Sequence, residues 1–349
     1  MPTKQKGILV RQRINRRVMF ALLPCVAGSV YFFGWRCLFI TVWAAMIAFI
    51  VEFIFTRHRK EPVSEAVFVT STIFALIMPP KVPLHVATIG IIFAIMFAKE
   101  VFGGFGRNIF NPAMAGRCFI YICFPIALTS TWAPPANGPW GALDRWTTAP
   151  NADAVTSATP MTYLKRSQII MEKADSKEIL SQIPSKIKTE QKVHIRKNRF
   201  LLALTFGRIS GTAGVTSVIL ILIGGAYLFC TKTASRQIIL SLVVTYAVLN
   251  QVLYWLGVEP VPGALPAMLG GGFLFGAFFM ATDPISAPRT ELAKIFYGIL
   301  IAVCTIVIRN FSIFNGGLMF SILIGNMFAP ILDYAVKAYK AGMTIKGGT

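Results

Sequence analysis

The sequence predicts an all-α integral membrane protein with about ten transmembrane helices, arranged as two inverted five-helix repeats with broken helices. Composition is the first observation: 55% of the 349 residues are hydrophobic and only 14% are charged, whereas soluble globular proteins average about 25% charged residues. The second is that apolar runs recur along most of the chain, many of them close to the roughly 20 residues that cross a bilayer. The third is an internal similarity between the two halves. Together these observations exclude an ordinary soluble domain.

The apolar runs give the positions of the expected spans. Several runs are short and are interrupted near Pro80, Pro112 and Pro284. In a bilayer, such breaks occur where protein or a polar cavity covers the freed backbone groups, so we expect these helices to be buried by their neighbours. The ten expected spans are residues 18–35, 37–55, 66–79, 84–98, 111–127, 214–231, 237–256, 265–282, 294–308 and 316–336.

The two halves share a pattern of breaks. Asn111 and Asn315 each follow an Ile-Phe pair, and Pro80 and Pro284 precede these asparagines by the same number of residues. Two breaks at equal separation indicate a duplicated five-helix unit. Because five is an odd number, the two units would be inverted with respect to each other in the membrane. The alternative is chance similarity between Gly- and Pro-rich membrane turns.

The basic residues orient the chain in the membrane. With the N-terminus inside, the Lys and Arg residues of the short loops fall on the cytoplasmic side, except for Arg36, Lys81 and Arg309. The positive-inside rule then places both termini in the cytoplasm and the long polar loop outside, because long loops translocate largely regardless of charge. The expected regions are a cytoplasmic basic N-terminus (1–17), a first five-helix repeat (18–127), an external loop (128–213), a second five-helix repeat (214–336) and a cytoplasmic tail (337–349).

Charge and cysteine content exclude other classes of function. A net charge of +20 would indicate a nucleic-acid partner in a soluble protein, but here most of the short-loop charge lies at the expected cytoplasmic edge, so no nucleic acid is expected. The six cysteines include no Cys-x-x-Cys pair and the three histidines are scattered, so no metal site is expected. Walker and Gly-x-Ser-x-Gly motifs are absent, which argues against an NTPase and a serine hydrolase.

The external loop contains a run of small and hydroxylated residues, Asp153-Ala154-Val155-Thr156-Ser157-Ala158-Thr159. It resembles the flavin-attachment motif Asp-x-x-[Ser/Thr]-Gly-Ala-[Ser/Thr], at which a flavin transferase links FMN to a threonine through a phosphoester. The resemblance implies covalent FMN at Thr159. Asp153 is then the carboxylate that holds a metal or orients the hydroxyl during transfer, and the small neighbours give the transferase access. Ser157 replaces the usual glycine, which adopts a positive φ more freely.

Three further segments carry a family resemblance: residues 98–117 (AKEVFGGFGRNIFNPAMAGR), 279–288 (FMATDPISAP) and 328–334 (FAPILDY). With the flavin motif, and in this order, they resemble the family that comprises the B-type subunit of the sodium-translocating NADH:quinone reductase and the D-type subunit of the Rnf electron-transport complex. The resemblance covers most of the chain from about residue 60 onward, apart from residues 165–200. The KEVFGG and AGR sequences favour the reductase. One departure is at residues 211–217, where the family usually has a glutamate before Thr-Ser.

The resemblance implies a membrane subunit of an ion-translocating electron-transport complex in the bacterial inner membrane. Electrons would pass from FMN on a partner subunit to the FMN at Thr159, then through a noncovalent riboflavin to a quinone near the cytoplasmic side. This reaction would drive Na⁺ or H⁺ across the membrane. The implied partners are the other subunits of the complex, including a second FMN-bearing subunit, the flavin transferase, the quinone and Na⁺. The chain would thus belong to an enzyme, a Na⁺-translocating NADH:quinone oxidoreductase.

Acids within membrane spans are functional candidates by default. Glu52, near the cytoplasmic end of the second span, resembles a carboxylate that lines the family's quinone pocket. The alternative is an interfacial acid paired with Arg57 or Arg59. Asp333 in the last span matches a family acid linked to sodium handling, and an ion pair with Lys337 is the competing interpretation. Glu52 and Asp333 are therefore the candidate catalytic residues.

Two residues at helix breaks are further candidates for cofactor binding, beside those of the flavin motif. Asn111 begins one broken helix and Asp283 follows another. Half-helix ends of this kind offer dipoles to the edge of a flavin or to an ion. For Asp283 we favour a helix cap over a direct ion ligand.

Two alternatives remain open from the sequence. One is the D-type subunit of an Rnf-type ferredoxin:NAD oxidoreductase. The other is a secondary transporter without redox activity, because inverted five-helix repeats with broken helices also describe transporter folds. The sequence leaves open whether Na⁺ or H⁺ is the coupled ion and which quinone accepts the electrons.

Overall fold

The computed structural model describes residues 9–136, 138, 140–148, 197–312 and 316–346, which are mainly helical. The helices of the first half are α1 (Arg13–Phe33), α2 (Trp35–Arg59), α3 (Ala66–Leu76), α4 (Leu84–Ile95), the π-helix η1 (Met96–Glu100), α5 (Pro112–Cys123) and α6 (Pro125–Thr129). The remaining helices are α9 (Lys197–Phe206), α10 (Val218–Cys230), α11 (Arg236–Trp255), α12 (Ala264–Leu269), α13 (Phe273–Phe275), the π-helix η2 (Gly276–Met280), α14 (Glu291–Phe311) and α15 (Gly317–Lys346).

Five described helices are long and apolar enough to cross a membrane. They are α1, α2, α11, α14 and residues 317–341 of α15, and each has the roughly 20 residues that span about 30 Å of hydrocarbon. The apolar helices α3, α5 and α10 are shorter. Each of the ten expected spans overlaps described helix, and residues 265–282 are divided among α12, α13 and η2. The prediction of a helical membrane protein is therefore confirmed.

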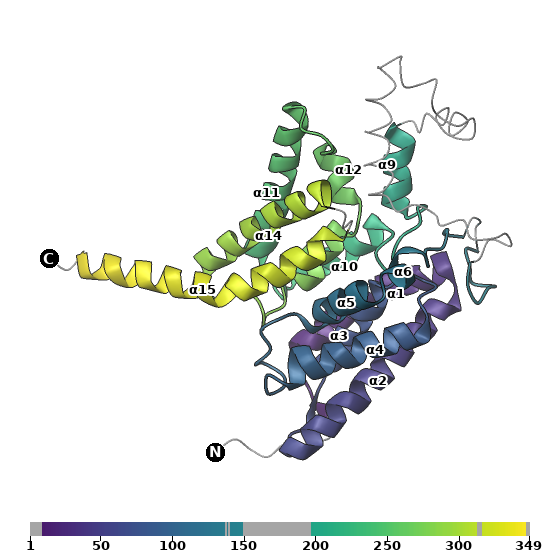
Figure 1. Cartoon of the computed structure of the whole chain (residues 1–349), viewed down its shortest axis with the longest axis horizontal. Helices are drawn as coiled ribbons and strands as arrows, with labels where there is room; N and C mark the ends of the chain where they lie inside the picture. Colours follow the sequence, from purple (N-terminus) through teal and green to yellow (C-terminus); the bar gives the residue numbers. More distant parts are fainter. Residues whose placement is uncertain (1–8, 137, 139, 149–196, 313–315, 347–349) are drawn as a thin grey trace.

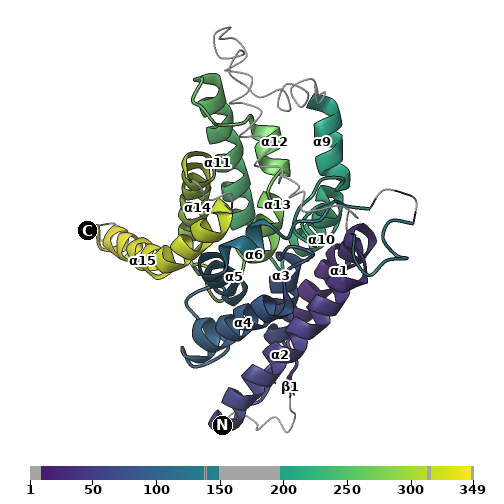
Figure 2. The same cartoon turned by 45° about the vertical axis from the view of Figure 1, so that its right-hand side comes forward.

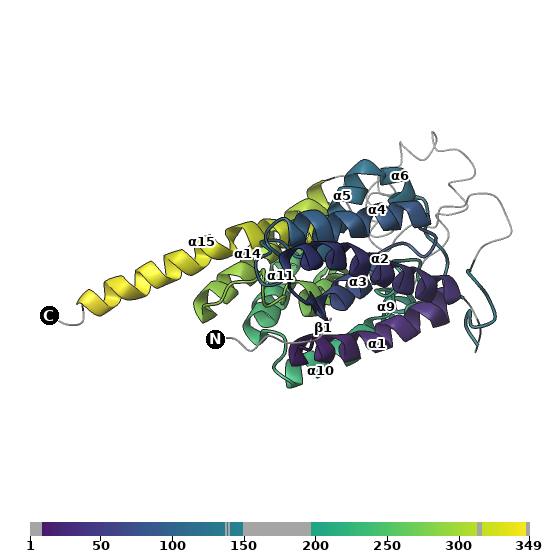
Figure 3. The ribbon, with the colours of Figure 1, turned by 90° about the horizontal axis from the view of Figure 1, so that it is seen from below.

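Most of the long helices form two groups, and α10, which contacts α13 and η2, lies against the first group. Helices α1 to α5 gather in one group, and α11, α14 and α15 in another (Figures 1 and 2). Helix α1 packs against α10, and α5 packs against α15. The C-terminal half of α15 extends beyond the other helices, which Figure 3 shows most clearly. Residues from both halves of the sequence therefore build the centre of the molecule.

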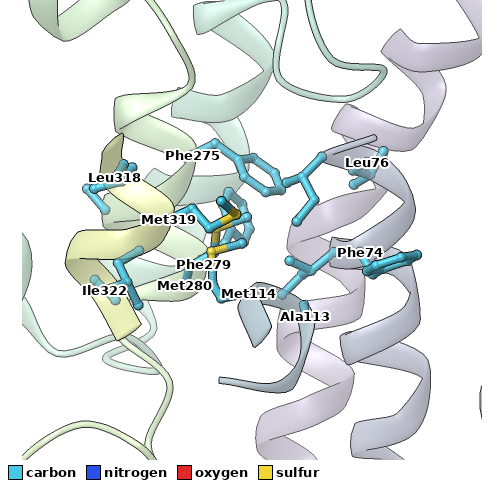
Figure 4. Packing of buried hydrophobic residues seen from close by; sticks show 14 of the residues in the cluster. Phe74, Leu76, Ala113, Met114, Phe275, Phe279, Met280, Leu318, Met319 and Ile322 are labelled. Carbon is cyan, nitrogen blue, oxygen red and sulfur yellow. The ribbon is translucent and has the colours of Figure 1, made fainter. Parts of the chain in front are cut away.

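The hydrophobic core lies where the two groups meet. Its side chains come from both halves and are almost fully buried. Figure 4 shows side chains of α5, α13, η2 and α15 gathered there, among them Met114, Phe275, Met280 and Met319. The three methionines suit this junction because their unbranched side chains fill irregular gaps.

The turn between α1 and α2 holds the first described stretch of the expected external loop, up to residue 148. The amides of Ala136, Ala142 and Thr148 donate to backbone carbonyls in the last turn of α1. Gly34 separates the two helices with a φ of +96°, and a Cβ there would lie 2.7 Å from the carbonyl oxygen of Arg145. Glycine therefore meets both a conformational and a steric requirement.

The expected flavin-attachment segment, Asp153 to Thr159, lies outside the described residues, as does the Asn315 half of the expected sequence repeat. The structure therefore describes neither the candidate threonine nor its neighbours Thr156, Ser157 and Ala158.

Candidate functional site

A pocket lies between the two halves of the molecule, which we call the central pocket. It is lined by the start of α1, by α3, by the segment from η1 to α5, and by the segment that follows η2. About 80 Å³ of its interior is open to groups of the size of water, and the pocket is only partly enclosed. The polar and aromatic side chains that line it include Lys99, Phe105, Asn108, Asn111, Phe278 and Asp283.

Asn111 occupies the start of α5 and connects it to the other half. Its side-chain oxygen accepts hydrogen bonds from the amides of Ala113 (3.1 Å) and Met114 (3.4 Å), so it is the N-cap of α5. Its Nδ2 donates to the carbonyl oxygen of Met280 at the end of η2, at 3.3 Å. Asn111 thus joins the two helix breaks through one buried amide.

Asn326 in α15 extends this connection. Its Oδ1 accepts from the backbone amide of Asn111 at 3.2 Å. Its Nδ2 donates to the Tyr297 hydroxyl at 2.9 Å and to the carbonyl oxygen of Ser286 at 3.2 Å. Asn326 and Tyr297 are both fully buried, and buried polar groups that are this well paired fix one arrangement of their elements.

Asp283 lies in the turn that follows η2 and lines the central pocket. Its Oδ1 accepts from the amide of Ile285 at 3.3 Å, and its Oδ2 accepts from the hydroxyl of Ser286 at 2.9 Å. These bonds close a turn, and the next helix, α14, begins only at Glu291. The amide of Ala287 also donates to the carbonyl oxygen of Asp283 at 3.1 Å, so Asp283 has the expected capping role, at a single helical turn and not at the start of a longer helix.

Glu52 is paired with a cation that the sequence reasoning did not assign to it. Its Oε2 lies 2.5 Å from Nζ of Lys99, and its Oε1 accepts from the amide (3.0 Å) and the hydroxyl (2.7 Å) of Ser64. Lys99 Nζ also donates to Ser64 Oγ at 2.9 Å. The predicted alternative pairing with Arg57 or Arg59 is wrong, because the cation bonded to Glu52 is Lys99 of η1 and Arg59 is bonded to Glu100.

The neighbouring residue Glu100 forms a second ion pair, with Arg59. Lys99 and Glu100 are adjacent, and both are at most 3% exposed. The wide π-helical turn of η1 allows two consecutive side chains to enter the protein, and such turns are frequent at functional sites. Gly104 leaves room for Arg59, since a Cβ at Gly104 would lie 2.7 Å from Nη2 of that arginine. We call Glu52, Arg59, Ser64, Lys99 and Glu100 the ion cluster.

The start of the described chain covers the ion cluster. Strand β1 (Leu9–Val10) pairs in parallel with β2 (Val63–Ser64), and β2 contains the Ser64 that bonds to Glu52. Next to this pair, the Arg16 guanidinium bonds to the Glu65 carboxylate at 2.8 Å. The N-terminal segment therefore holds in place the strand that supplies two of the three hydrogen bonds to Glu52.

Asp333 belongs to α15 and does not line the central pocket. Its side chain lies against the start of the neighbouring helix α14. Its two oxygens accept from the amides of Arg289 and Thr290 and from the Thr290 hydroxyl, each at 2.8 Å. A carboxylate at this position interacts favourably with the N-terminal dipole of the helix. The competing interpretation, an ion pair with Lys337, is wrong, because Asp333 of α15 caps the neighbouring helix instead.

A second buried cation, Arg309, lies near the C-terminal end of α14. It is 1% exposed. Its Nη1 donates to the Tyr246 hydroxyl at 3.3 Å and to the Gly270 carbonyl at 3.5 Å, and its Nη2 donates to the Gly271 carbonyl at 2.6 Å. Its guanidinium also lies 5.9 Å from the ring centres of Tyr246 and Phe273. Arg309 thus secures the break between α12 and α13.

The structure therefore brings some predicted site residues together and separates others. Asn111 and Asp283 line one pocket, and Glu52 is joined to that pocket through Lys99. Asp333 lies elsewhere. The sequence reasoning missed Lys99 and Asn326. Both could have been found as polar residues in or beside an apolar run, because polar groups within membrane spans usually have a function.

The chemistry of the central pocket fits one edge of a polar aromatic ligand. Asn108 and Asn111 carry amides, Asp283 carries a carboxylate, and Phe105 and Phe278 supply aromatic surface. An interior of this size takes a ring edge, and a larger ligand such as a flavin would extend beyond the enclosed part of the pocket. Among the residues the structure describes, no group of three or more His, Cys, Asp or Glu side chains is arranged to hold a metal ion.

Comparison with known proteins gives one consistent family. Residues 6–342 match the model of the NQR2, RnfD, RnfE family. The B-type subunit of the Na⁺-translocating NADH-quinone reductase of Pseudoalteromonas atlantica is 34% identical over 325 residues, which cover 90% of this chain and 70% of that protein. The proteins of the same name from Azotobacter vinelandii (33% identical; 91% of this chain, 73% of that protein) and Klebsiella pneumoniae (34%; 88% and 67%) are similarly close.

Proposed function

Because the chain belongs to the NQR2, RnfD, RnfE family, we propose that it is the flavin-bearing membrane subunit of an ion-translocating electron-transport complex. The relatives named above are B-type subunits of a Na⁺-translocating NADH-quinone reductase. The observation that best supports a redox role is the central pocket, where two helix breaks bring amides, a carboxylate, an ammonium group and aromatic rings together.

The first proposed cofactor is FMN attached to Thr159 through a phosphoester. Its support is the sequence Asp153-x-x-Thr156-Ser157-Ala158-Thr159, which supplies the accepting hydroxyl, small neighbours and one carboxylate. Attachment requires a flavin transferase as a maturation partner. A second FMN-bearing subunit would supply the electrons.

The second proposed cofactor is a noncovalent riboflavin with one edge in the central pocket. Asn108 and Asn111 would bind its polar atoms, and Asp283 would accept a hydrogen bond from a ring N–H. Phe278 would lie against the ring. Such a flavin supplies electron transfer between the covalent FMN and a quinone, and the role of this chain is to bind and orient it.

The two acids have separate roles in the proposal. Glu52 lies within the ion cluster beside the pocket, where it would line the site of quinone reduction. Asp333 would take part in ion handling at the start of α14. Its three hydrogen bonds to that helix give it a structural role as well.

The proposed topology has ten spans in two inverted repeats in the bacterial inner membrane, with both termini in the cytoplasm. The five long apolar helices support five of the crossings. The helical breaks on both sides of the central pocket support paired, interrupted helices of the kind found in inverted repeats.

Two other functions are compatible with the same architecture. The family description includes RnfD as well as NQR2, so a ferredoxin-linked complex is the nearer alternative. A secondary transporter without redox activity is the more distant one, because broken helices around a polar pocket also suit solute binding.

Flavin content separates the two redox functions from the transporter. The full chain, co-expressed with a flavin transferase and denatured on a gel, is expected to show yellow-green fluorescence in its band. Thr159→Ala is expected to abolish this fluorescence, and the matched control Thr162→Ala, just outside the motif, is expected to keep it. A dark wild-type band after co-expression contradicts the covalent-FMN proposal and favours the transporter.

A further inference from the structure

We propose that Lys99 is a positioning residue that links the charge in the central pocket to the ion-binding state of Glu52. When the ligand in the pocket gains negative charge, Lys99 turns towards it, and Glu52 binds a cation in its place. This inference rests on the proposed redox function and adds a coupling residue to it.

The first support is that Lys99 belongs to both sites. Its Nζ bonds to Glu52 Oε2 at 2.5 Å and to Ser64 Oγ at 2.9 Å, while its side chain also lines the central pocket. An ammonium group has three N–H donors. Two of them have oxygen acceptors among the described residues, and Nζ lies 5.7 Å from the centre of the Phe105 ring, which lines the same pocket. One donor is therefore available to a pocket ligand.

The second support is that Glu52 keeps other partners when Lys99 moves. Ser64 donates to Glu52 Oε1 through its amide (3.0 Å) and its hydroxyl (2.7 Å). These bonds hold the carboxylate in position, but they bring no positive charge. A carboxylate that is 1% exposed requires a proton or a cation nearby, because an uncompensated buried charge is strongly unfavourable.

The third support is that no cation among the described neighbours can readily replace Lys99. Arg59 is bonded to Glu100 and to Glu61, so its charge is already matched. Asp283 is on the pocket wall and interacts electrostatically with Lys99. The groups that face Glu52 and Lys99 are thus Ser64, Glu100 and Asp283, none of which carries positive charge.

The charge balance follows directly. One electron leaves the reduced flavin proposed at Thr159, which is thereby oxidised, and reduces the flavin-class ligand in the pocket. Lys99 offsets the new negative charge. Glu52 then takes up one Na⁺, or one H⁺ that forms an O–H bond on its carboxylate, so the net charge of the buried region after uptake is the same as before reduction.

The test is an equilibrium redox titration of the noncovalent flavin in the purified complex. Its reduction potential is measured at low and high Na⁺ at constant pH, and at two pH values at constant Na⁺. In the wild type, the potential is expected to rise with the concentration of the coupled cation. Acid extraction and chromatography of each sample give the noncovalent flavin content.

Glu52→Gln frees Lys99 from its carboxylate, so the potential is expected to rise above that of the wild type and to lose its cation dependence. Glu52→Gln combined with Lys99→Met is expected to lower the potential again and to remain independent of the cation. This double variant contains a neutral pair, which avoids an unpaired buried charge. Glu65→Gln is the matched control, since it removes a nearby carboxylate that pairs with Arg16 and is outside the ion cluster, and it is expected to keep the cation dependence.

Two results would overturn the inference. One is an unchanged cation dependence in Glu52→Gln, and the other is an equal potential in Glu52→Gln and in the double variant. In both cases the flavin is present and the proposed function stands. A wild-type complex that yields no noncovalent flavin removes the pocket cofactor from the proposed function as well, and the inference fails with it.

Discussion

Two buried cations are held in different ways. Lys99 bonds to side-chain oxygens of Glu52 and Ser64, whereas Arg309 bonds to the backbone carbonyls of Gly270 and Gly271 and to the Tyr246 hydroxyl. Both are at most 2% exposed. The charge of Lys99 is matched by the carboxylate of another side chain, and this is the pairing that we propose is exchanged for a ligand and an ion. The second cation has no carboxylate partner among the described residues, and it holds a broken helix in one conformation.

The difference assigns separate roles to the two halves of the molecule. In the first half, η1 supplies Lys99 and Glu100 to a charge-balanced cluster beside the central pocket. In the second half, Arg309 lies against stacked Tyr246 and Phe273 rings whose centres are 3.9 Å apart. A permanently charged guanidinium with backbone acceptors suits a fixed structural link. We therefore expect substitutions at both cations to lower stability, but only those at Lys99 and Glu52 to change the cation dependence of the flavin potential.

The largest effect is expected from Lys99→Met. The change leaves Glu52 buried without a cation, which lowers the free energy of unfolding by about 3–5 kcal/mol. Adding Glu52→Gln is expected to restore most of that loss, because the pair is then neutral. Denaturation of the purified chain in detergent, followed by tryptophan fluorescence, measures both. Equal instability of the single and double variants would show that the two charges are not coupled.

Arg309→Leu is expected to have the next largest effect. It removes the donor to the Gly271 carbonyl and to the Tyr246 hydroxyl, while the Gly270 carbonyl keeps the amide of Phe273, and each unsatisfied buried group contributes roughly 1–3 kcal/mol. The same denaturation experiment should show a loss on the order of 3 kcal/mol. Arg309→Lys keeps the charge with fewer donors, so it should recover part of the stability. The cation dependence of the flavin potential is expected to persist in Arg309→Lys, and its loss would contradict the structural role.

The contrast between the two cations also shows what the sequence could predict. Apolar runs and their Pro and Gly breaks predicted the helices, because both depend on local chemistry. The pocket position of Asn111 and Asp283 followed from those breaks. The partner of Glu52 could not be predicted in this way, because Lys99 is distant in the sequence and contacts Glu52 from the wide turn of η1. The bonds from Asp333 to α14 likewise depend on how two helices pack.

A smaller effect is expected at Asp333. Asp333→Asn keeps a side-chain oxygen for the start of α14 but removes the charge, so we expect a loss of about 1 kcal/mol. If Asp333 also handles the ion, the variant weakens the Na⁺ activation of quinone reduction while flavin content stays normal. Steady-state activity at several Na⁺ concentrations measures this. Unchanged activation would leave Asp333 with the capping role alone.

The smallest effect is expected at the ion pair between Arg16 and Glu65, beside the strand pair of the N-terminal segment. The hydrogen bond from Arg16 lowers the pKa of Glu65 below its ordinary value. The pair therefore stabilises the fold above the pKa of the unfolded carboxyl, about 4.3, and this contribution is lost as the pH falls through the lower folded value. The stability difference between the wild type and Glu65→Gln should be present at about pH 6 and shrink towards about pH 3.5. A difference that grows on acidification would contradict this assignment.

The proposal that this membrane protein is a redox subunit and not a transporter depends most on FMN attachment at Thr159. The most direct measurement is mass spectrometry of the peptide that contains Thr159, from the full chain co-expressed with a flavin transferase. We predict a peptide heavier by one FMN joined through a phosphoester, with Thr159 as the modified residue. An unmodified peptide, from cells in which the same transferase flavinylates a second FMN-bearing subunit, would contradict it.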